Sequence, residues 1–348
     1  MEKICVGILG ATGLVGQTYA NLLDNHPFFK VVFLAASDRF VGYFYKEALF
    51  GRQKYSLSDS ILEHKMESMT SVKRAATCCR LVFSALQSDV ASKYEPLFAQ
   101  AGMGVFSHAA YHRQMSDIPL IIPEINPDHL FLIPIQQKKR GWDKGFILAK
   151  PNCSLQSYLL PLYPLHRLFK LKKALVTMLQ SVSGGGSHCR LDNNIVPYIE
   201  GEELKSEGEP LKILGRIQGN QIKLAKQIRF SVHCNRVPVQ EGHLACIAAE
   251  FQKKPSLDEM IDAWNTFTAL PQKLNLPFAP KHPTIYIPER DRPQPQFDLK
   301  EGMSVIVGRL RDCPVLGMRF TALSHNLIRG AAGGMILLAE LCEKLEYI

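Results

Sequence analysis

One cysteine in the middle of the chain has the surroundings expected of a nucleophile. Cys153 follows the apolar run Phe146–Ala149 and precedes a helical pattern of leucines that begins at Leu159. This order predicts a strand-to-helix turn that places Cys153 near a helix N-terminus. The partial positive charge there favours the thiolate, which is the nucleophilic form of cysteine. Without further support an inert buried thiol is the default expectation, since free cysteines are among the most buried residues.

Composition places the chain among globular proteins with room for two domains. It has 348 residues, of which 46% are hydrophobic and 21% charged, which is the balance of a packed protein. The nine cysteines are scattered, with no Cys-x-x-Cys pair and no clustered Cys/His spacing, so we expect no metal site. Because there is no signal peptide and no apolar run of membrane-spanning length, we expect a cytoplasmic protein without membrane contact.

The excess of basic over acidic residues limits the kinds of partner that the chain could bind. The formal net charge is +9 at pH 7 and the pI is about 9.0. The basic residues are dispersed, and no nucleic-acid-binding motif occurs, so we expect no nucleic-acid partner. The charge is better explained by solubility and by attraction of a small anionic substrate and cofactor.

A glycine-rich turn follows the first predicted strand, residues 4–9. Gly10, Gly13 and Gly16 form a GxxGxxG variant of the dinucleotide-binding fingerprint, and a helical pattern follows. Glycines allow a tight turn and a close backbone approach to pyrophosphate, and the helix N-terminus receives the phosphates. The expected cofactor-binding residues of this turn are Gly10, Thr12, Gly13, Leu14 and Val15.

The second predicted strand, residues 31–36, ends at Ser37-Asp38-Arg39, where the adenosine ribose of a dinucleotide would lie. An acid there favours the 2′-hydroxyl of NAD, whereas an arginine accommodates the 2′-phosphate of NADP. We favour NADP, bound by Ser37 and Arg39. A further strand over residues 81–85 runs into a loop in which Ser84 is expected near the cofactor. The alternating strands and helices predict a Rossmann-type doubly wound parallel sheet.

The pattern changes after Cys153. Strands separated by loops predict a second, α+β domain with a mostly antiparallel sheet, and residues 326–347 read as a helix that packs back on the first domain. The predicted dinucleotide-binding domain is therefore residues 1–152 plus 326–348, and the catalytic and dimerisation domain is residues 153–325. The predicted strands of the second domain cover residues 174–179, 230–243, 303–310 and 316–323.

At this point the chain resembles the aspartate-semialdehyde dehydrogenases, in the branch found in archaea, fungi and some bacteria. The resemblance covers nearly the whole chain, and seven motifs occur in the family's order. They are Gly10-Ala-Thr-Gly-Leu-Val-Gly16, Pro151-Asn-Cys-Ser154, Gln180-x-x-Ser-Gly184, Glu202-Glu-x-Lys205, Arg236-Val-Pro-Val-x-x-Gly-His243, Arg292-Pro-Gln-Pro295 and Ser324-His-Asn326.

The resemblance implies reduction of L-4-aspartyl phosphate to L-aspartate 4-semialdehyde with NADPH, a step in lysine, threonine and methionine biosynthesis. Cys153 would attack the acyl phosphate and form a thioester, which hydride then reduces. His243 matches the acid/base residue of the family. The resemblance also implies a homodimer or homotetramer.

The resemblance further assigns the substrate contacts. Arg236 matches the residue that holds the α-carboxylate, for which a planar guanidinium is suited. Glu202 matches the partner of the amino group. Lys205 and Arg113 match phosphate-binding positions, and Gln180 matches the residue that orients the substrate beside the cysteine. On the cofactor side, the residues that match nicotinamide contacts are Ser183, Gly184 and Asn326.

The chain departs from the family pattern at three positions. Phe40 and Tyr43 stand where many relatives have a serine and a lysine, so two polar partners of the 2′-phosphate are lost and NADH use becomes plausible. His108 stands where an asparagine is common in the stretch before Arg113. A histidine there could still donate a hydrogen bond to phosphate.

Two other classes of function remain open from the residues alone. A malonyl-CoA reductase or an N-acetyl-glutamyl-phosphate reductase would share the cysteine, the histidine and the Rossmann domain, because a fold does not determine the substrate. Glu202 argues against malonyl-CoA, which has no amino group. A non-catalytic binding protein that uses the positive charge is the less favoured class, because the full set of Cys153, His243 and Arg236 is present.

Overall fold

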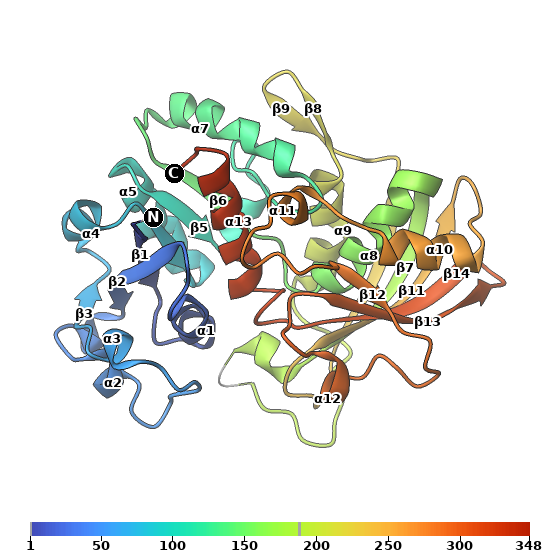
Figure 1. Ribbon diagram of the computed structural model, residues 1–348, viewed down its shortest axis with the longest axis horizontal. Helices are drawn as coiled ribbons and strands as arrows, with labels where there is room; N and C mark the ends of the chain where they lie inside the picture. Colours follow the sequence, from blue (N-terminus) through green and yellow to red (C-terminus); the bar gives the residue numbers. More distant parts are fainter. Residues whose placement is uncertain (1, 187–188) are drawn as a thin grey trace.

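Two six-stranded sheets lie side by side in the structure, a computed structural model that describes residues 2–186 and 189–348 (Figure 1). The first sheet has the order β3-β2-β1-β4-β5-β6, and all its neighbouring strands are parallel. Residues 4–9, 31–36, 81–85 and 146–149 stood out in the sequence because strands that are buried on both faces read as continuous apolar runs. The sheet has six strands in all. They are β1 (Ile4–Leu9), β2 (Phe29–Ala36), β3 (Met66–Ser68), β4 (Leu81–Ser84), β5 (Gly104–Ser107) and β6 (Phe146–Ala149).

Helices connect the strands of the first sheet, as parallel strands require. The longest, α1 and α5, pack against the sheet. Together these features confirm the predicted Rossmann-type sheet. The helices in this part of the chain are α1 (Leu14–Leu23), η1 (Asp38–Phe40), α2 (Tyr45–Ala48), α3 (Asp59–Leu62), α4 (Val72–Cys78), α5 (Ser88–Gln100), α6 (Ala110–Arg113), η2 (Pro127–Phe131) and α7 (Leu132–Arg140).

The second sheet is mixed, with the order β10-β7-β11-β14-β13-β12. Its three central pairings, β7 with β11, β11 with β14 and β14 with β13, are antiparallel, and the two outer pairings are parallel. The prediction of a mostly antiparallel second sheet is therefore confirmed. The strands are β7 (Leu171–Gln180), β10 (Arg229–Arg236), β11 (His243–Phe251), β12 (Thr284–Tyr286), β13 (Val305–Cys313) and β14 (Gly317–Ser324), with a separate hairpin β8 (Arg216–Gln218) and β9 (Gln221–Lys223).

One face of the second sheet is covered and the other is open. Along β7 the side chains of Ala174, Val176 and Met178 are buried, whereas Leu175 and Thr177 between them are exposed. Helices α8 and α10 pack on the covered face. The alternation follows from the two-residue period of a strand with one face in the core. The helices here are α8 (Leu155–Phe169), η3 (Val182–Gly185), α9 (Glu202–Ile213), α10 (Leu257–Asn265), α11 (Leu270–Lys273), α12 (Pro295–Asp298) and, at the C-terminus, α13 (Ala332–Lys344).

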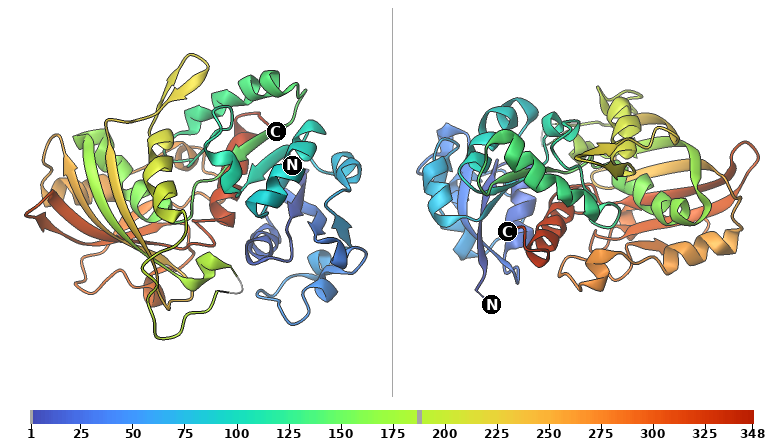
Figure 2. Two further views of the ribbon diagram at one scale, coloured as in Figure 1. Left: turned by 180° about the vertical axis from the view of Figure 1, so that it is seen from behind. Right: turned by 90° about the horizontal axis from the view of Figure 1, so that it is seen from above.

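Two predicted elements have different bounds in the structure. The strand expected over residues 230–243 is two strands, because β10 ends at Arg236 and β11 begins at His243. Pro238 lacks an N–H and Gly242 has a φ of 95°, so the intervening residues turn. The last helix begins at Ala332 instead of residue 326. It does pack back on the first domain as expected, against α1, and Figure 2 shows it between the two sheets.

A buried ion pair fastens the segment between β14 and α13. Arg329 donates to both carboxylate oxygens of Glu124, at 2.6 and 2.5 Å, and to Oε1 of Gln156 at 3.1 Å. Arg329 is 1% exposed and Glu124 is 2% exposed. Glu124 lies before η2, in the part of the chain that forms the first sheet. Gln156 lies in the first turn of α8, three residues after Cys153. This bidentate pair therefore joins the end of the chain to both halves of the molecule.

Removal of one partner of this pair should destabilise the fold. In Glu124→Gln the guanidinium of Arg329 stays buried without its counter-charge, which costs about 3–5 kcal/mol of the free energy of unfolding. Urea denaturation at one protein concentration measures this. The matched control replaces both partners by apolar residues, Glu124→Leu with Arg329→Met, and should lose much less stability. If the single variant were as stable as the parent, the pair would not hold this junction.

Candidate active site

The predicted nucleophile and the predicted acid/base residue meet although 90 positions separate them. Cys153 lies in the turn between β6 and α8, and His243 is the first residue of β11. The Sγ of Cys153 is 3.2 Å from Nε2 of His243. This is hydrogen-bond distance for a sulfur, so a proton can pass between thiol and imidazole.

The turn that carries Cys153 is held by its neighbours. Oδ1 of Asn152 accepts hydrogen bonds from the backbone N–H of Ser154, at 2.9 Å, and from its hydroxyl, at 2.7 Å. No side chain caps the first turn of α8. The positive end of α8 lies beside the sulfur, as the sequence predicted.

Hydrogen bonds to His243 decide where its proton lies. Nδ1 accepts from the backbone N–H of Ser181 at 3.1 Å, so the neutral ring carries its proton on Nε2, facing the sulfur of Cys153. The Ser181 hydroxyl is 3.3 Å from Nδ1 and is the available acceptor when the ring becomes imidazolium. Burial, with the nearby Arg236, lowers the pKa of His243 to about 3. The resting ring is therefore neutral.

The thiol of Cys153 is subject to opposing charges. Burial, together with the carboxylate of Glu202, raises its pKa to about 11. The cations of Lys150, Arg113 and Arg236 act in the opposite direction and favour the thiolate. In the unliganded site the thiol and imidazole are thus both neutral, and neutralisation of Glu202 by a bound cation would make the thiolate easier to form.

The carboxylate of Glu202 accepts hydrogen bonds from three side chains, of which Gln180 and Lys205 are predicted site residues. Oε2 accepts from Nδ2 of Asn152 at 2.7 Å and from Nε2 of Gln180 at 3.2 Å, and Oε1 accepts from Nζ of Lys205 at 3.0 Å. Burial opposes ionisation, but Lys205 and these donors hold the pKa of Glu202 below its usual value. The site therefore contains a fixed negative charge at the start of α9.

Arg236, at the end of β10, supplies a fixed positive charge on the same site. Its Nη1 donates to the backbone carbonyl of Ser181 at 2.7 Å, and the residue is 8% exposed. Among residues 2–186 and 189–348 it has no carboxylate partner. A Cβ at Gly184 would lie 2.8 Å from Nη1 of Arg236 and 2.9 Å from Cε1 of His243. A side chain there would displace one of these groups, so Gly184 lies directly against Arg236 and His243.

Sequence reasoning missed Glu209, which links two parts of the site. Its carboxylate is buried and accepts from Nη1 of Arg113 at 3.0 Å and from the backbone N–H of Asn152 at 2.7 Å. Glu209 thereby fixes the predicted phosphate-binding arginine relative to the turn of Cys153. The signal was present in the sequence, because Glu202, Lys205 and Glu209 are spaced i, i+3, i+7 on one face of α9.

The glycine-rich turn has the geometry of a phosphate-binding loop. Gly10 has a φ of 77°, and a Cβ at Gly16 would lie 2.2 Å from the carbonyl oxygen of Gly10, so glycine is required at both positions. No side chain caps α1 at Gly13, which is exposed, and this leaves N–H groups of its first turn available to pyrophosphate. Thr12, Leu14 and Val15 lie partly exposed in the same loop. These features fit a dinucleotide.

The end of β2 favours a phosphorylated ribose. Ser37 and Arg39 are exposed, as a ligand-binding role requires. The carboxylate of Asp38 accepts a hydrogen bond from the hydroxyl of Ser68, at 2.8 Å, so the acid is partly engaged by β3. In the sequence Asp38 favoured NAD and Arg39 favoured NADP. The hydrogen bond from Ser68 engages Asp38, which favours NADP.

Of the other predicted cofactor residues, Asn326 and Ser183 lie beside His243, and Ser84 lies at the end of β4. Nδ2 of Asn326 donates to the hydroxyl of Ser183 at 2.9 Å, and Oδ1 of Asn326 accepts from the N–H of Gly242 at 2.8 Å. These contacts put Asn326 and Ser183, two of the three predicted nicotinamide residues, next to His243. Ser84 is fully buried at the end of β4, and its hydroxyl has no hydrogen-bond partner within the described part of the chain.

His108 has a different environment from the one considered in the sequence. Its Nε2 is 2.5 Å from the hydroxyl of Tyr19, and the residue lies next to the predicted phosphate site, because its carbonyl accepts from Nη2 of Arg113 at 2.8 Å. Burial, with the charges of Lys150 and Arg113, keeps the pKa of His108 well below its usual value. The ring is therefore neutral and bonded to Tyr19.

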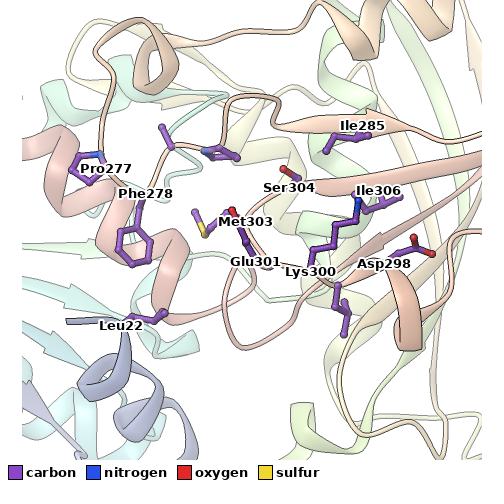
Figure 3. Close-up of a pocket in the computed structure, with 14 residues that line it drawn as sticks. Leu22, Pro277, Phe278, Ile285, Asp298, Lys300, Glu301, Met303, Ser304 and Ile306 are labelled. Atoms are coloured by element: carbon purple, nitrogen blue, oxygen red, sulfur yellow. The ribbon is translucent and has the colours of Figure 1, made fainter. Parts of the chain in front are cut away.

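A separate cavity lies away from these residues (Figure 3). Its volume is about 520 Å³, and it is lined by Leu22 of α1, residues 277–280, Ile285, residues 298–304 and Ile306. None of the predicted catalytic, substrate or cofactor residues lines it. The catalytic pair and this cavity are thus distinct features.

Two family models match this chain. The model described as semialdehyde dehydrogenase, NAD binding domain, matches residues 5–133, and the model described as semialdehyde dehydrogenase, dimerisation domain, matches residues 162–329. A curated aspartate-semialdehyde dehydrogenase of Archaeoglobus fulgidus is 42% identical over 352 residues, which cover 99% of this chain and 100% of that protein. The chain belongs to the aspartate-semialdehyde dehydrogenase family.

Further relatives support the family and its branch. The aspartate-semialdehyde dehydrogenase of Cryptococcus neoformans is 37% identical over 352 residues, covering 97% of this chain and 96% of that protein. The crystal structure of aspartate semialdehyde dehydrogenase with NADP from Candida albicans matches with a TM-score of 0.91 and 35% identity, over 100% of both chains. The predicted resemblance to the archaeal and fungal branch of the aspartate-semialdehyde dehydrogenases is confirmed.

Two searches of the described residues concern other classes of site. No group of three His, Cys, Asp or Glu side chains in residues 2–186 and 189–348 is arranged to hold a metal ion. No helix of these residues combines the length and the hydropathy that a bilayer crossing needs.

The opposing charges around Cys153 lead to a test of this site. Glu202→Gln removes the negative charge that disfavours the thiolate, so the pKa of Cys153 should fall. Alkylation of Cys153 by iodoacetamide, followed as a function of pH, should reach its half-maximal rate at a lower pH than in the parent. Glu203→Gln is the matched control, because the Glu203 carboxylate accepts from the N–H of Cys234 instead. An unchanged profile in Glu202→Gln would contradict the electrostatic account.

Proposed function

We propose that the protein catalyses the NADPH-dependent reductive dephosphorylation of L-4-aspartyl phosphate to L-aspartate 4-semialdehyde, through a thioester on Cys153. The observation that carries the proposal is the 3.2 Å contact between Cys153 and His243, with a fixed anion, Glu202, and a cation, Arg236, beside it. A zwitterionic amino acid needs one charge of each sign, which a substrate without an amino group does not. Membership of the aspartate-semialdehyde dehydrogenase family supports the same reaction.

The cofactor is NADP, as in the Candida albicans enzyme whose structure was solved with it. In the proposed arrangement the pyrophosphate lies on Gly10, Gly13 and the first turn of α1, and the 2′-phosphate lies by Ser37 and Arg39. Bound NADPH supplies the hydride. Asn326, hydrogen-bonded to Ser183, would orient the nicotinamide beside the catalytic pair.

The first half of the reaction forms a bond to sulfur. The thiol of Cys153 gives its proton to His243, and the thiolate attacks the acyl carbon. The bond from that carbon to the phosphate oxygen breaks, and phosphate leaves with the electron pair. Nε2 takes this proton after the ring's own proton has moved to Nδ1, where the Ser181 hydroxyl accepts it.

In the second half of the reaction His243 transfers a proton to the substrate oxygen and later takes it back. Once hydride has reached the thioester carbon, Nε2–H gives a proton to the oxygen and a thiohemiacetal forms on Cys153. Its hydroxyl then returns the proton to the imidazole, the carbon–sulfur bond breaks, and the aldehyde leaves. The N–H of Ser181 and the pairing of β7 with β11 keep the imidazole in place through both proton transfers.

Each end of the substrate has a partner in this proposal. Glu202 binds the ammonium group, and its own partner Lys205 then becomes free to bind phosphate with Arg113. Arg236 binds the α-carboxylate with the two nitrogens of its fork. Gln180, which touches Glu202 through its amide, positions the substrate beside the sulfur.

The open face of the second sheet supports a homodimer or homotetramer. Leu175 on β7 is 48% exposed, and Cys246 on β11 is exposed as well. These residues lie in the part of the chain that matches the dimerisation domain of the family. We propose that residues 1–152 with 326–348 bind the cofactor, and that residues 153–325 supply the catalytic groups and the contact between subunits, in a cytoplasmic enzyme of aspartate-derived amino-acid synthesis.

A reverse assay tests the proposed function. With aspartate semialdehyde, phosphate and NADP⁺ the enzyme should form NADPH, and with malonyl-CoA or N-acetylglutamyl phosphate plus NADPH it should show little turnover. Cys153→Ser should abolish turnover but leave NADP⁺ binding nearly intact, since only the nucleophile is lost. A faster reaction with either alternative substrate, or full activity of Cys153→Ser, would contradict the proposal.

The link between Glu209 and Arg113 gives a second test. Glu209→Gln removes the carboxylate that fixes Arg113, so the KM for phosphate in the reverse reaction should rise about tenfold, which corresponds to about 1.4 kcal/mol, and the KM for aspartate semialdehyde should change less. Glu207→Gln on the same helix is the matched control, because an amide oxygen can still accept from the N–H of Val232. Equal changes in both KM values would mean that Glu209 does not act through Arg113.

A further inference from the structure

A second arginine lies near Arg39, and the proposed reaction does not use it. Arg52 follows α2 in the chain, 13 positions after Arg39. The guanidinium carbon of Arg39 is 4.6 Å from the centroid of the Phe40 ring, and that of Arg52 is 5.6 Å from the same centroid. One aromatic ring thus contacts two cationic side chains, each of which is attracted to its face.

The turn that carries Arg52 is attached to the glycine-rich loop. Gln17, a buried residue of α1, donates from Nε2 to the carbonyl of Arg52 at 3.2 Å and to the carbonyl of Thr12 at 3.1 Å. Its Oε1 accepts from the N–H of Lys54 at 2.9 Å. One side chain therefore fixes the backbone of Arg52 relative to the pyrophosphate-binding turn, and Figure 1 shows the loop between α2 and α3 passing below α1.

The positive charge at this place is not neutralised by the protein. Among the residues that the structure describes, neither Arg39 nor Arg52 forms a salt bridge. Both residues are exposed. The acid next in sequence, Asp38, accepts a hydrogen bond from Ser68. Two exposed guanidiniums without a carboxylate partner, beside a phosphate-binding turn, match a ligand that carries a second phosphate.

We propose that Arg52 is a specificity-determining residue for the cofactor and binds the 2′-phosphate of NADP together with Arg39. The Phe40 ring holds both guanidiniums at the end of β2, and Gln17 fixes the distance from there to the pyrophosphate. Phe40, which cannot bond to phosphate itself, thereby contributes through the arginines that it positions. NAD, with a neutral hydroxyl in place of the phosphate, gains little from either cation.

Calorimetric titration of the full-length protein separates this role from catalysis. The probes are adenosine 2′,5′-bisphosphate, which carries the 2′-phosphate, and adenosine 5′-monophosphate, which lacks it. Arg52→Gln should raise the Kd for the bisphosphate about tenfold or more, because a charge-assisted hydrogen bond to phosphate is lost. Its Kd for the monophosphate should stay within about twofold. Arg52→Lys keeps the charge but loses the planar fork, and should give an intermediate Kd.

The matched control is Arg216→Gln, an exposed arginine in the β8–β9 hairpin, which should change neither Kd. Steady-state kinetics should agree, with a KM for NADP⁺ that rises in Arg52→Gln and a KM for NAD⁺ that does not. Unchanged binding of the bisphosphate, or an equal loss for both probes, would overturn the assignment. Because the titration uses no aspartyl substrate, it stays decisive even if the proposed reaction fails its own assay.

Discussion

The contact between Cys153 and His243 joins two halves of the molecule, and the proposed chemistry depends on it. The sulfur follows β6 of the first sheet, and the imidazole begins β11 of the second. A proton can pass only while the two atoms stay near 3.2 Å apart. The junction is therefore held by buried charge pairs: Arg329 with Glu124, and Arg113 with Glu209. Such pairs are directional, which apolar packing alone is not.

In the unliganded site the two proposed reacting groups are neutral, and the charges lie on neighbouring side chains. The Cys153 thiol and the His243 ring are neutral at rest, because burial disfavours both charged forms. Glu202 and Arg236 carry the fixed charges, and they match the two ends of an amino acid. In the proposed mechanism a bound ammonium group offsets the charge of Glu202 at the sulfur, so that substrate binding itself favours the thiolate. Substrate recognition and activation of the nucleophile then rest on one carboxylate.

The nicotinamide side and the adenosine side are built differently. Near the reacting atoms the residues are buried and joined by hydrogen bonds, as in the link from Gly242 through Asn326 to Ser183. Where we propose that the adenosine ribose binds, Arg39 and Arg52 are exposed, and both guanidinium groups lie over the ring of Phe40. A buried site needs exact hydrogen-bond partners because unpaired polar groups are costly there, whereas an exposed site can select a phosphate by charge alone.

Local patterns in the sequence determined four of the six strands of the first sheet (β1, β2, β4 and β6), the glycine turn at Gly10 and the place of Cys153 before a helix. These follow from contacts within about ten residues, such as periodicity and turn chemistry. The matched motifs pointed to the substrate residues only through resemblance to a family. Tertiary structure alone decided that β10 stops at Arg236, that Glu209 bridges Arg113 to the cysteine turn, and that Arg52 reaches Phe40. Those contacts join residues far apart in the chain, and their spacing follows no period, because they arise only when separate elements pack.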